Sequence, residues 1–239
     1  IDLYVKRGLF EEAQKVFDGV QVCTIVSWNA LISGYSDPTR ADVMLDFFDQ
    51  LEKEGFSPNI VTFITILKAC ASTGVTTSEC REIHIKISKK GLETDLMVRS
   101  TLIDTYAKYG LFDDAQSVFD GNSHRNAVSW NALLSGYDEH GCSEEALKCF
   151  DQMQMEGLYR DTITFVCGLK ACGSTKSFGK GKQIHNEVAQ RRLLEKDTAL
   201  GTALVDMYAK CGVLTTARQV LDELEVRDLV SWNILLTGY

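Results

Sequence analysis

The amino-acid sequence predicts an all-α fold, an α-solenoid built from helix–turn–helix repeats. The segment Val-Ser-Trp-Asn occurs three times, and its tryptophans, Trp28, Trp130 and Trp232, are spaced 102 residues apart. The chain has only two prolines and no alternating pattern of apolar and polar residues that would predict strands. A fixed period of this kind is typical of repeat arrays, in which each unit buries its apolar face against its neighbours.

Each 102-residue period divides into a medium, a long and a short repeat of 35, 36 and 31 residues. This division predicts six complete repeats between two partial ones. The predicted bounds are 1–24 for the end of a short repeat, then 25–59, 60–95, 96–126, 127–161, 162–197 and 198–228, and finally 229–239 for the start of a medium repeat. Because the chain begins and ends within repeats, we expect it to belong to a longer protein.

Each repeat is expected to form two helices joined by a turn. In the first half of a medium repeat, Trp28, Leu31, Ile32 and Tyr35 follow the spacing of one apolar helix face, and the second half carries a similar stripe. Glycine is predicted at the turns and helix ends, where it adopts a positive φ at little cost. These glycines are Gly55, Gly110, Gly141, Gly157 and Gly212. The predicted N-caps of the first helices are Ser27, Ser129 and Ser231.

The composition is that of a folded protein without a membrane span. Of 239 residues, 45% are hydrophobic and 24% are charged, and no apolar run reaches the roughly 18 residues of a transmembrane helix. Cys70 and Cys172, two of the eight cysteines, occupy the same position of the two long repeats, within apolar helical patterns. This placement predicts buried free thiols and a reducing compartment.

The repeated words resemble the motifs of a known family. The segments "VSWNALISGY", "FITILKACAS" and "TALVDMYAKCG" are similar to the P, L and S motifs of plant-type pentatricopeptide repeat (PPR) proteins of the PLS class. Tetratricopeptide, HEAT and armadillo repeats do not match the 35–36–31 triplet. The resemblance covers the entire chain. It implies a right-handed superhelix that binds single-stranded RNA in its groove, about one base per repeat.

The resemblance also implies which residues read the bases, because in this family the fifth and the last residue of each repeat contact the base edges. The fifth residues are Asn29, Ser100, Asn131, Thr202 and, in the last partial repeat, Asn233. The last residues are Asn59, Asn126, Asp161 and Asp228. By the code of the family, the first four pairs in chain order resemble readers of cytosine, adenine, uracil and guanine. The long repeats place Ile64 and Val166 at the fifth position, so the implied register is 5′-C-n-A-U-n-G-3′.

Further contacts follow from the same resemblance. The second residue of a repeat packs against the base faces, which implies this role for Val26, Met97, Val128, Ala199 and Val230. Ala199 is small for this role. A lysine near the end of the first helix meets the RNA phosphates, which implies that role for Lys6, Lys108 and Lys210.

The residues alone also support a polar face. Beside the apolar stripe of each first helix runs a line of short polar residues at i, i+4, for example Asn131 and Ser135. Two alternatives remain open at this point. Asn and Asp at the repeat ends are also typical helix caps, and the tryptophans, which could stack on bases, are better explained as core residues because they lie on the apolar stripe.

Net charge argues against tight nonspecific RNA binding. The chain carries 25 Lys and Arg against 33 Asp and Glu, a formal charge of −8, whereas proteins held by phosphate contacts are usually basic. We therefore expect weak nonspecific binding and a strong dependence on base contacts.

A catalytic site is not expected. His185-Asn186-Glu187 matches the H-x-E half of a zinc deaminase signature, but the chain contains no C-x-x-C to complete it. We therefore expect no enzyme activity, no metal and no cofactor in this chain, and neither a membrane nor a small-molecule substrate as partner.

The expected function is sequence-specific recognition of single-stranded RNA. By the resemblance, the chain would be the site-recognition module of an RNA editing or processing factor in a plant mitochondrion or chloroplast. The alternative is a protein-interaction scaffold that docks editing-factor proteins through the long repeats, whose fifth residues are apolar. RNA binding by the isolated chain separates the two.

Overall fold

A computed structural model describes residues 1–20, 22–35, 40–72, 75–121, 125–194, 197–224 and 229–238. All regular secondary structure in these residues is helical, which confirms the predicted all-α repeat fold. One short 3-10 helix, η2 (Leu92–Thr94), accompanies fifteen α-helices in the described ranges. The α-helices are α1 (Asp2–Lys6), α2 (Phe10–Asp18), α3 (Ile25–Gly34), α4 (Ala41–Lys53), α5 (Ile60–Ser72), α6 (Thr77–Lys89), α7 (Leu96–Lys108), α8 (Phe112–Asp120), α9 (Ala127–Glu139), α10 (Ser143–Met155), α11 (Thr162–Ser174), α12 (Phe178–Gln190), α13 (Thr198–Lys210), α14 (Leu214–Glu223) and α15 (Leu229–Gly238).

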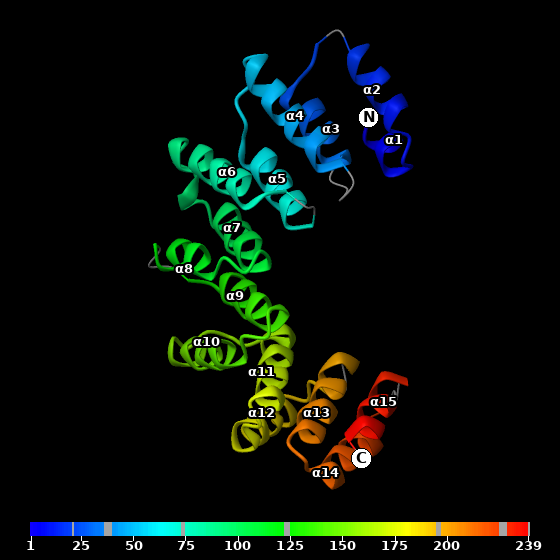
Figure 1. Cartoon of the computed structure of the whole chain (residues 1–239), viewed down its shortest axis with the longest axis vertical. Helices are drawn as coiled ribbons and strands as arrows, with labels where there is room; N and C mark the ends of the chain where they lie inside the picture. The colour runs from blue at the N-terminus through cyan, green and yellow to red at the C-terminus, as the bar shows by residue number, and fades with distance from the viewer. Residues whose placement is uncertain are drawn as a thin grey trace. The chain divides into compact units, whose positions relative to one another are not determined.

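The chain forms two compact units, Ile1–Ser123 and His124–Tyr239. In the first unit, α3 packs against α5 and α5 against α7, so the first helices of successive pairs lie side by side (Figure 1). The second helices form another layer, in which α4 packs against both α3 and α5. Neither layer can bury its apolar stripe without the other, which is the physical basis of this repeat architecture.

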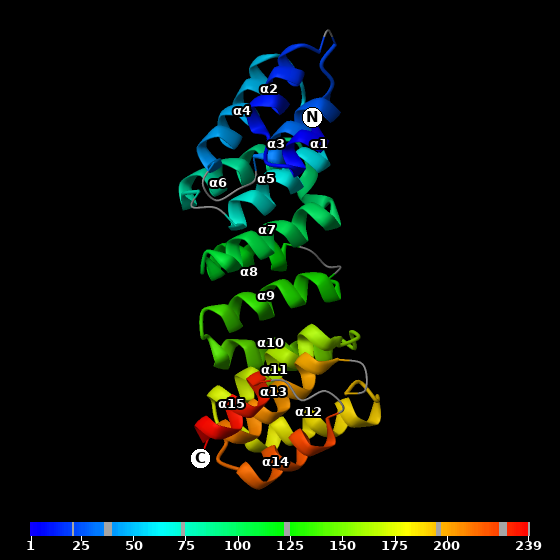
Figure 2. The same cartoon turned by 90° about the vertical axis from the view of Figure 1, so that its right-hand side faces the viewer.

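The second unit repeats the same arrangement. Its first helices, α9, α11, α13 and α15, each pack against the next (Figures 1 and 2). Each second helix packs against the first helix of its own pair and against the first helix of the following pair; these second helices are α10, α12 and α14. Among the described residues, no helix combines the length and apolar character needed to cross a lipid bilayer.

The first helices α3, α9 and α15 begin two residues before the predicted serines. Thr24 is the N-cap of α3 and accepts a hydrogen bond from the Ser27 N–H, and Asn126 caps α9 through the Ser129 N–H. Ser231 is likewise the third residue of α15. The prediction that the three serines are N-caps is therefore wrong. The apolar stripe begins at the tryptophan, one turn into the helix, so it does not reveal the first turn, whose second residue is exposed to solvent.

The glycines predicted at turns do adopt the left-handed conformation. Their φ angles are positive, between 69° and 84°, at Gly55, Gly110, Gly141, Gly157 and Gly212. Residues with a Cβ atom pay roughly 1–2 kcal/mol for this conformation. The sequence pattern therefore located these turns correctly.

The repeated tryptophans belong largely to the core. Trp28 and Trp130 are buried, whereas Trp232 is half-buried, and the Arg218 guanidinium lies 5.2 Å from the centre of its ring. Cys70 and Cys172 are fully buried, as predicted, and all eight cysteines are free. Burial raises the pKa of the Cys172 thiol to about 12, so this thiol is protonated at neutral pH.

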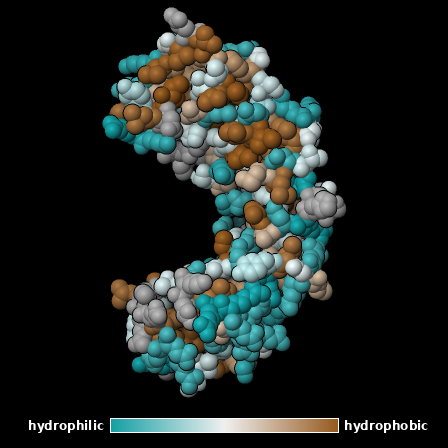
Figure 3. All heavy atoms as spheres, turned by 180° about the vertical axis from the view of Figure 1, so that it is seen from behind, coloured by the Kyte–Doolittle hydropathy of each residue, from teal (hydrophilic) through white to brown (hydrophobic). Residues whose placement is uncertain are grey.

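Apolar side chains also reach the surface. On the face drawn in Figure 3, apolar residues form patches over the first unit, and hydrophilic residues cover more of the second unit. The exposed apolar residues include a regularly spaced set, the second residues of the first helices α3, α5, α7, α9, α11 and α15. A single exposed apolar residue is normal, but a periodic set on equivalent helices is not.

Candidate nucleic-acid interface

The fifth and last residues of each medium repeat lie side by side. In the first unit, Asn29 on α3 donates from Nδ2 to Asn59 Oδ1 over 3.4 Å. In the second unit, Asn131 on α9 donates from Nδ2 to Asp161 Oδ2 over 2.8 Å. These residues are 30 positions apart in sequence and meet because consecutive first helices pack against each other. The two residues that the family resemblance names as one pair therefore form one polar cluster in each unit.

A buried threonine completes each cluster. Thr62, the third residue of α5, places its Oγ1 2.7 Å from Asn29 Oδ1 and 3.0 Å from Asn59 Oδ1. Thr164, the third residue of α11, places its Oγ1 2.8 Å from Asn131 Oδ1 and 3.0 Å from Asp161 Oδ1. Both threonine side chains are fully buried. The same three-residue cluster thus occurs in both units.

Helix capping and pairing occur together at the last residue. Asp161 is the N-cap of α11: its Oδ1 accepts from the Thr164 N–H over 3.0 Å, while its Oδ2 accepts from Asn131. Asn59 Oδ1 accepts the corresponding Thr62 N–H over 3.0 Å. Capping, the alternative interpretation of these residues, therefore does not exclude a role in base reading.

For the other predicted base-reading residues, the structure describes only one member of the pair or places the two members in different units. Ser100 is buried on α7, and Asn126 caps α9 in the other unit. Thr202 Oγ1 donates to Thr198 O over 3.0 Å and lies 3.0 Å from Ser231 Oγ. Its predicted partner, Asp228, lies outside the described residues. Asn233 is exposed on α15.

The predicted base-packing residues are all exposed to solvent. Val26, Met97, Val128 and Val230 are between 56% and 70% exposed, and the small Ala199 is exposed as well. Sequence reasoning missed Val61 and Ile163, the second residues of the long repeats, which are exposed in the same way. Their position in the repeat is the signal that would have identified them.

A shallow groove in the second unit joins several of these positions. It has a volume of about 580 Å³ and lies among α11, α13 and α15. Its lining includes two second residues, two fifth residues and two charged residues, namely Ala199, Val230, Val166, Thr202, Lys170 and Asp206. A lining that combines apolar residues with a few polar and charged ones has the chemistry of a surface that accepts a flat aromatic base.

Lys108 and Lys210, which are predicted to bind phosphate, pair with aspartates on their own helices. Lys108 Nζ lies 2.9 Å from Asp104 Oδ2, and Lys210 Nζ lies 2.8 Å from Asp206 Oδ2, both at i, i+4 spacing. Lys6 is exposed on α1. Partly exposed pairs of this kind contribute little stability, at most about 1 kcal/mol. A phosphate therefore competes with a carboxylate for each paired lysine, at a modest cost.

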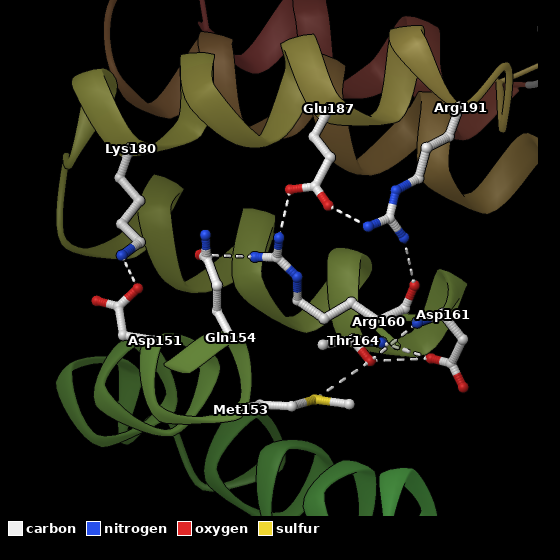
Figure 4. A network of polar contacts seen from close by, with 9 residues as sticks. All are labelled: Asp151, Met153, Gln154, Arg160, Asp161, Thr164, Lys180, Glu187 and Arg191. Carbon is white, nitrogen blue, oxygen red and sulfur yellow. Dashed lines mark hydrogen bonds and ion pairs between the residues drawn. The ribbon is translucent and has the colours of Figure 1, made fainter. Parts of the chain in front are cut away.

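An ion network holds the residue that precedes Asp161. Figure 4 shows Arg160 between Gln154 and Glu187, with distances of 3.0 Å from Arg160 Nη1 to Gln154 Oε1 and 2.6 Å from Arg160 Nη2 to Glu187 Oε2. Arg191 also pairs with Glu187 at 2.6 Å and donates to the Arg160 carbonyl over 3.1 Å. The Arg160 side chain is almost fully buried. This network fixes the backbone that carries Asp161.

The same network accounts for the glutamate of the H-x-E motif. Glu187 accepts from two arginines, and His185 Nδ1 lies 2.9 Å from the Tyr208 hydroxyl. Burial lowers the His185 pKa below its ordinary value. Within the described ranges, no group of three or more His, Cys, Asp and Glu residues could hold a metal ion. Both residues thus have partners that explain them as parts of the helical packing.

Comparisons with known proteins agree with this architecture. The model of the PPR repeat family matches residues 24–72 and 125–174, and that of the PPR repeat matches residues 1–23 and 98–121, together more than half of the chain. A mitochondrial pentatricopeptide repeat-containing protein of Arabidopsis thaliana is 40% identical over 242 residues, which are 100% of this chain and 37% of the relative. The chloroplastic protein CRR2 of Arabidopsis thaliana is 34% identical over 244 residues, with the same coverage. The chain thus spans little more than a third of these relatives.

Two solved structures share the fold. The crystal structure of the pentatricopeptide repeat protein PPR10 from maize superposes with a TM-score of 0.70 at 22% identity, covering 98% of this chain and 35% of that chain. PPR10 in complex with an 18-nt psaJ RNA element superposes with a TM-score of 0.61 at 18% identity, covering 99% and 41%. The paired helices, the repeated sequence segments and these matches together show that the chain belongs to the pentatricopeptide repeat family.

Proposed function

We propose that this chain is a sequence-specific single-stranded RNA-binding module of the PLS class, reading about one base per repeat. Its repeats are those bounded in the sequence at 25–59, 60–95, 96–126, 127–161, 162–197 and 198–228, with partial repeats at both ends. The observation that carries the proposal is the recurrence of the hydrogen-bonded fifth–last pair, Asn29–Asn59 in one unit and Asn131–Asp161 in the other. A maize relative of the same fold has been crystallised with RNA, which supports the class of ligand.

The two pairs differ in what they offer a base. Asn131 donates one amide N–H to Asp161 and accepts one hydrogen bond from Thr164. Its second N–H and the second lone pair of its Oδ1 remain for a base. Asp161 only accepts, so this pair suits uracil, whose N3–H needs an acceptor. Asn59 replaces that carboxylate with an amide that also donates, which suits cytosine, whose N3 needs a donor. Donor and acceptor counts therefore agree with the family code at both positions.

The other positions complete the proposed register, 5′-C-n-A-U-n-G-3′. Ser100 with Asn126 reads adenine, and Thr202 with Asp228 reads guanine. Ile64 and Val166 cannot hydrogen-bond a base, so the long repeats accept any nucleotide. The exposed second residues, such as Val128, pack against the base faces.

The acidic charge sets the expected affinity. With a net charge of −8 and with Lys108 and Lys210 paired to aspartates, phosphate attraction is weak. Base contacts therefore supply most of the discrimination, and nonspecific binding is poor. This balance suits a module that positions another activity on one site.

The cellular role follows from the relatives. Those at 33–40% identity include mitochondrial and chloroplastic proteins. We place this chain in an organelle as the site-recognition module of an RNA editing or processing factor. The chemistry would be supplied by another domain or another protein.

An electrophoretic mobility shift tests the function. The chain is titrated against a short RNA that contains C-n-A-U-n-G and against a scrambled RNA of the same composition. We expect binding of the first RNA to be at least tenfold tighter, at low salt and in the presence of competitor. Equal binding of both RNAs would reject sequence-specific recognition by this chain.

A second function is supported by the apolar fifth residues of the long repeats. Ile64 and Val166 are only half-buried, and Val166 lines the groove of the second unit. Such positions suit contact with a protein, for example an organellar editing factor, that docks on the long repeats. In that case RNA binds tightly only after the partner is added, whereas the first function requires binding by the chain alone.

A further inference from the structure

A buried hydroxyl side chain recurs beside the base-reading pairs. It is always the third residue of the first helix that follows the last residue of a repeat. The four positions are Thr62, Ser129, Thr164 and Ser231, and all are at most 3% exposed. Burying a hydroxyl costs free energy unless it is hydrogen-bonded, so a recurring buried hydroxyl needs a reason.

The geometry gives each threonine hydroxyl a defined task. Thr164 Oγ1 accepts the Asp161 N–H over 3.3 Å and lies 2.8 Å from Asn131 Oδ1, the nearer of two oxygen acceptors, with Asp161 Oδ1 at 3.0 Å (the bonds to Asp161 appear in Figure 4). In the other unit, Thr62 Oγ1 accepts the Asn59 N–H over 3.2 Å and lies 2.7 Å from Asn29 Oδ1. A single hydroxyl thus connects the fifth residue to the last residue in both units.

This connection fixes the orientation of the amide that faces the base. The Asn131 side chain can rotate by 180° and exchange its oxygen and nitrogen, which are similar in size. The Asp161 carboxylate only accepts, so it attracts Nδ2, while the Thr164 proton attracts Oδ1. The remaining N–H donor and the remaining lone pair of Asn131 then have fixed positions toward the base. A base whose edge places its own donor and acceptor the other way round binds less tightly.

Helix capping alone does not explain the hydroxyl. Asp95 caps α7 by accepting from Met97 N and Val98 N, and Asp197 caps α13, yet the third residues of these helices are Val98 and Leu200. Both apolar residues are fully buried. They follow the long repeats, whose fifth residues, Ile64 and Val166, have no amide to orient. The third residue of a first helix therefore carries a hydroxyl where the fifth residue of the preceding repeat is polar, and it is apolar where that fifth residue is apolar. The presence of an N-cap makes no difference.

We propose that Thr62 and Thr164 are positioning residues for base selection, because their buried hydroxyls hold the Asn29 and Asn131 amides in one orientation toward a nucleobase of single-stranded RNA. This inference rests on the proposed RNA-binding function and assigns specificity to a third residue for each of these bases. Ser231 takes the same place beside Thr202, 3.0 Å from its hydroxyl.

The test replaces one threonine hydroxyl with a methyl group of similar size, so that the shape of the side chain is kept. The variants are Thr164→Val, which is isosteric, Thr164→Ser, which keeps the hydroxyl, and Thr62→Val, which makes the same change in the other unit. A matched control is Thr105→Val, because Thr105 is equally buried but donates to Leu67 O and Thr101 O, away from any reading pair. Fluorescence anisotropy measures binding to RNAs that contain C-n-A-U-n-G and carry each of the four bases at the first or the fourth position.

We expect Thr164→Val to lose about tenfold in the preference for U over C at the fourth position, the equivalent of one hydrogen bond of about 1.4 kcal/mol. The preference of Thr164→Val at the first position stays as in the wild type. Thr62→Val loses preference at the first position and keeps it at the fourth. Thr164→Ser and Thr105→Val keep the preferences at both positions. Circular dichroism melts identify any loss of folding.

The outcomes separate this inference from the proposed function. If the wild-type chain discriminates between bases and Thr164→Val and Thr62→Val discriminate equally well, the positioning role is wrong and the function stands. A uniform loss of affinity for all RNAs also overturns it, since that is the effect of a purely structural residue. If the wild-type chain shows no base preference, both proposals fall.

Discussion

Asn131 Nδ2 lies 2.8 Å from Asp161 Oδ2, although the two residues are 30 positions apart in the sequence. The equivalent contact in the other unit joins Asn29 and Asn59. The two contacts join equivalent positions, over 3.4 Å and 2.8 Å, and differ in one functional group, a carboxylate in place of an amide. This single difference provides an internal comparison, because each pair serves as the control for the other.

The fifth residue can be changed without disturbing the cap. Asn131→Thr keeps Asp161 and its capping hydrogen bond, and converts the pair into the Thr–Asp combination predicted at 202 and 228. We expect the preferred base at the fourth position to move from U toward G, as measured by anisotropy with four RNAs. A uniform loss for all four bases would argue against base reading by Asn131.

Asp206 competes with RNA phosphates for Lys210, which is 2.8 Å away. Asp206→Asn removes that competition, so we expect RNA affinity to rise several-fold and the slope of log K against log salt to steepen by about 0.7, the value for one phosphate on a single strand. Asp222→Asn makes the same change of net charge on α14, where Asp222 pairs with Arg218. Equal effects of both variants would mean that net charge, not Lys210, sets the affinity.

Arg160 supports the backbone that carries Asp161. Arg160→Ala removes two hydrogen bonds and the packing of the guanidinium 4.8 Å from the centre of the Phe150 ring. We expect the free energy of unfolding in urea to fall by about 1–3 kcal/mol. Lys182→Ala, on the exposed face of α12, should change it by less than about 0.5 kcal/mol. An Arg160→Ala variant as stable as the wild type would contradict a structural role for the network.

Acid should destabilise the second unit through His185. Burial lowers its folded-state pKa below 6.5, although Glu223 opposes the shift. As the pH falls below about 6.5, the unfolded chain takes up a proton that the folded chain does not, so stability is retained above that pH and lost below it. His185→Asn keeps a polar atom near the Tyr208 hydroxyl and should flatten the dependence of the melting temperature on pH between about 5 and 7. Identical slopes for both chains would exclude His185 as the cause.

The sequence predicts the elements of this fold well because their signals are local. Gly110 and Gly212 mark turns through a backbone conformation that glycine alone adopts cheaply, and the stripe around Trp28 marks the buried helix face. The N-caps predicted for α3, α9 and α15 are wrong, because the first turn carries exposed residues such as Val26 and lies outside the apolar stripe.

The candidate site is predictable only in part. The family resemblance names Asn131 and Asp161, since motif positions are a property of the sequence. It does not reveal Thr164, which reaches Asn131 from another helix 33 residues further along the chain. Nor does it reveal the pairing of Arg160 with Glu187, which depends on the packing of α12. These contacts are tertiary: the repeat marks Thr164 as the counterpart of Thr62, but the sequence does not show what either residue contacts.

A reciprocal exchange of the last residues tests the account most directly. Asn59→Asp and Asp161→Asn both keep a strong N-cap and exchange only an amide and a carboxylate. Binding is measured to RNAs with C or U at the first and fourth positions. We predict that Asn59→Asp moves the first position from C to U, and that Asp161→Asn moves the fourth from U to C. Unchanged preferences in both variants, or an equal loss for C and U, would contradict base reading by these pairs.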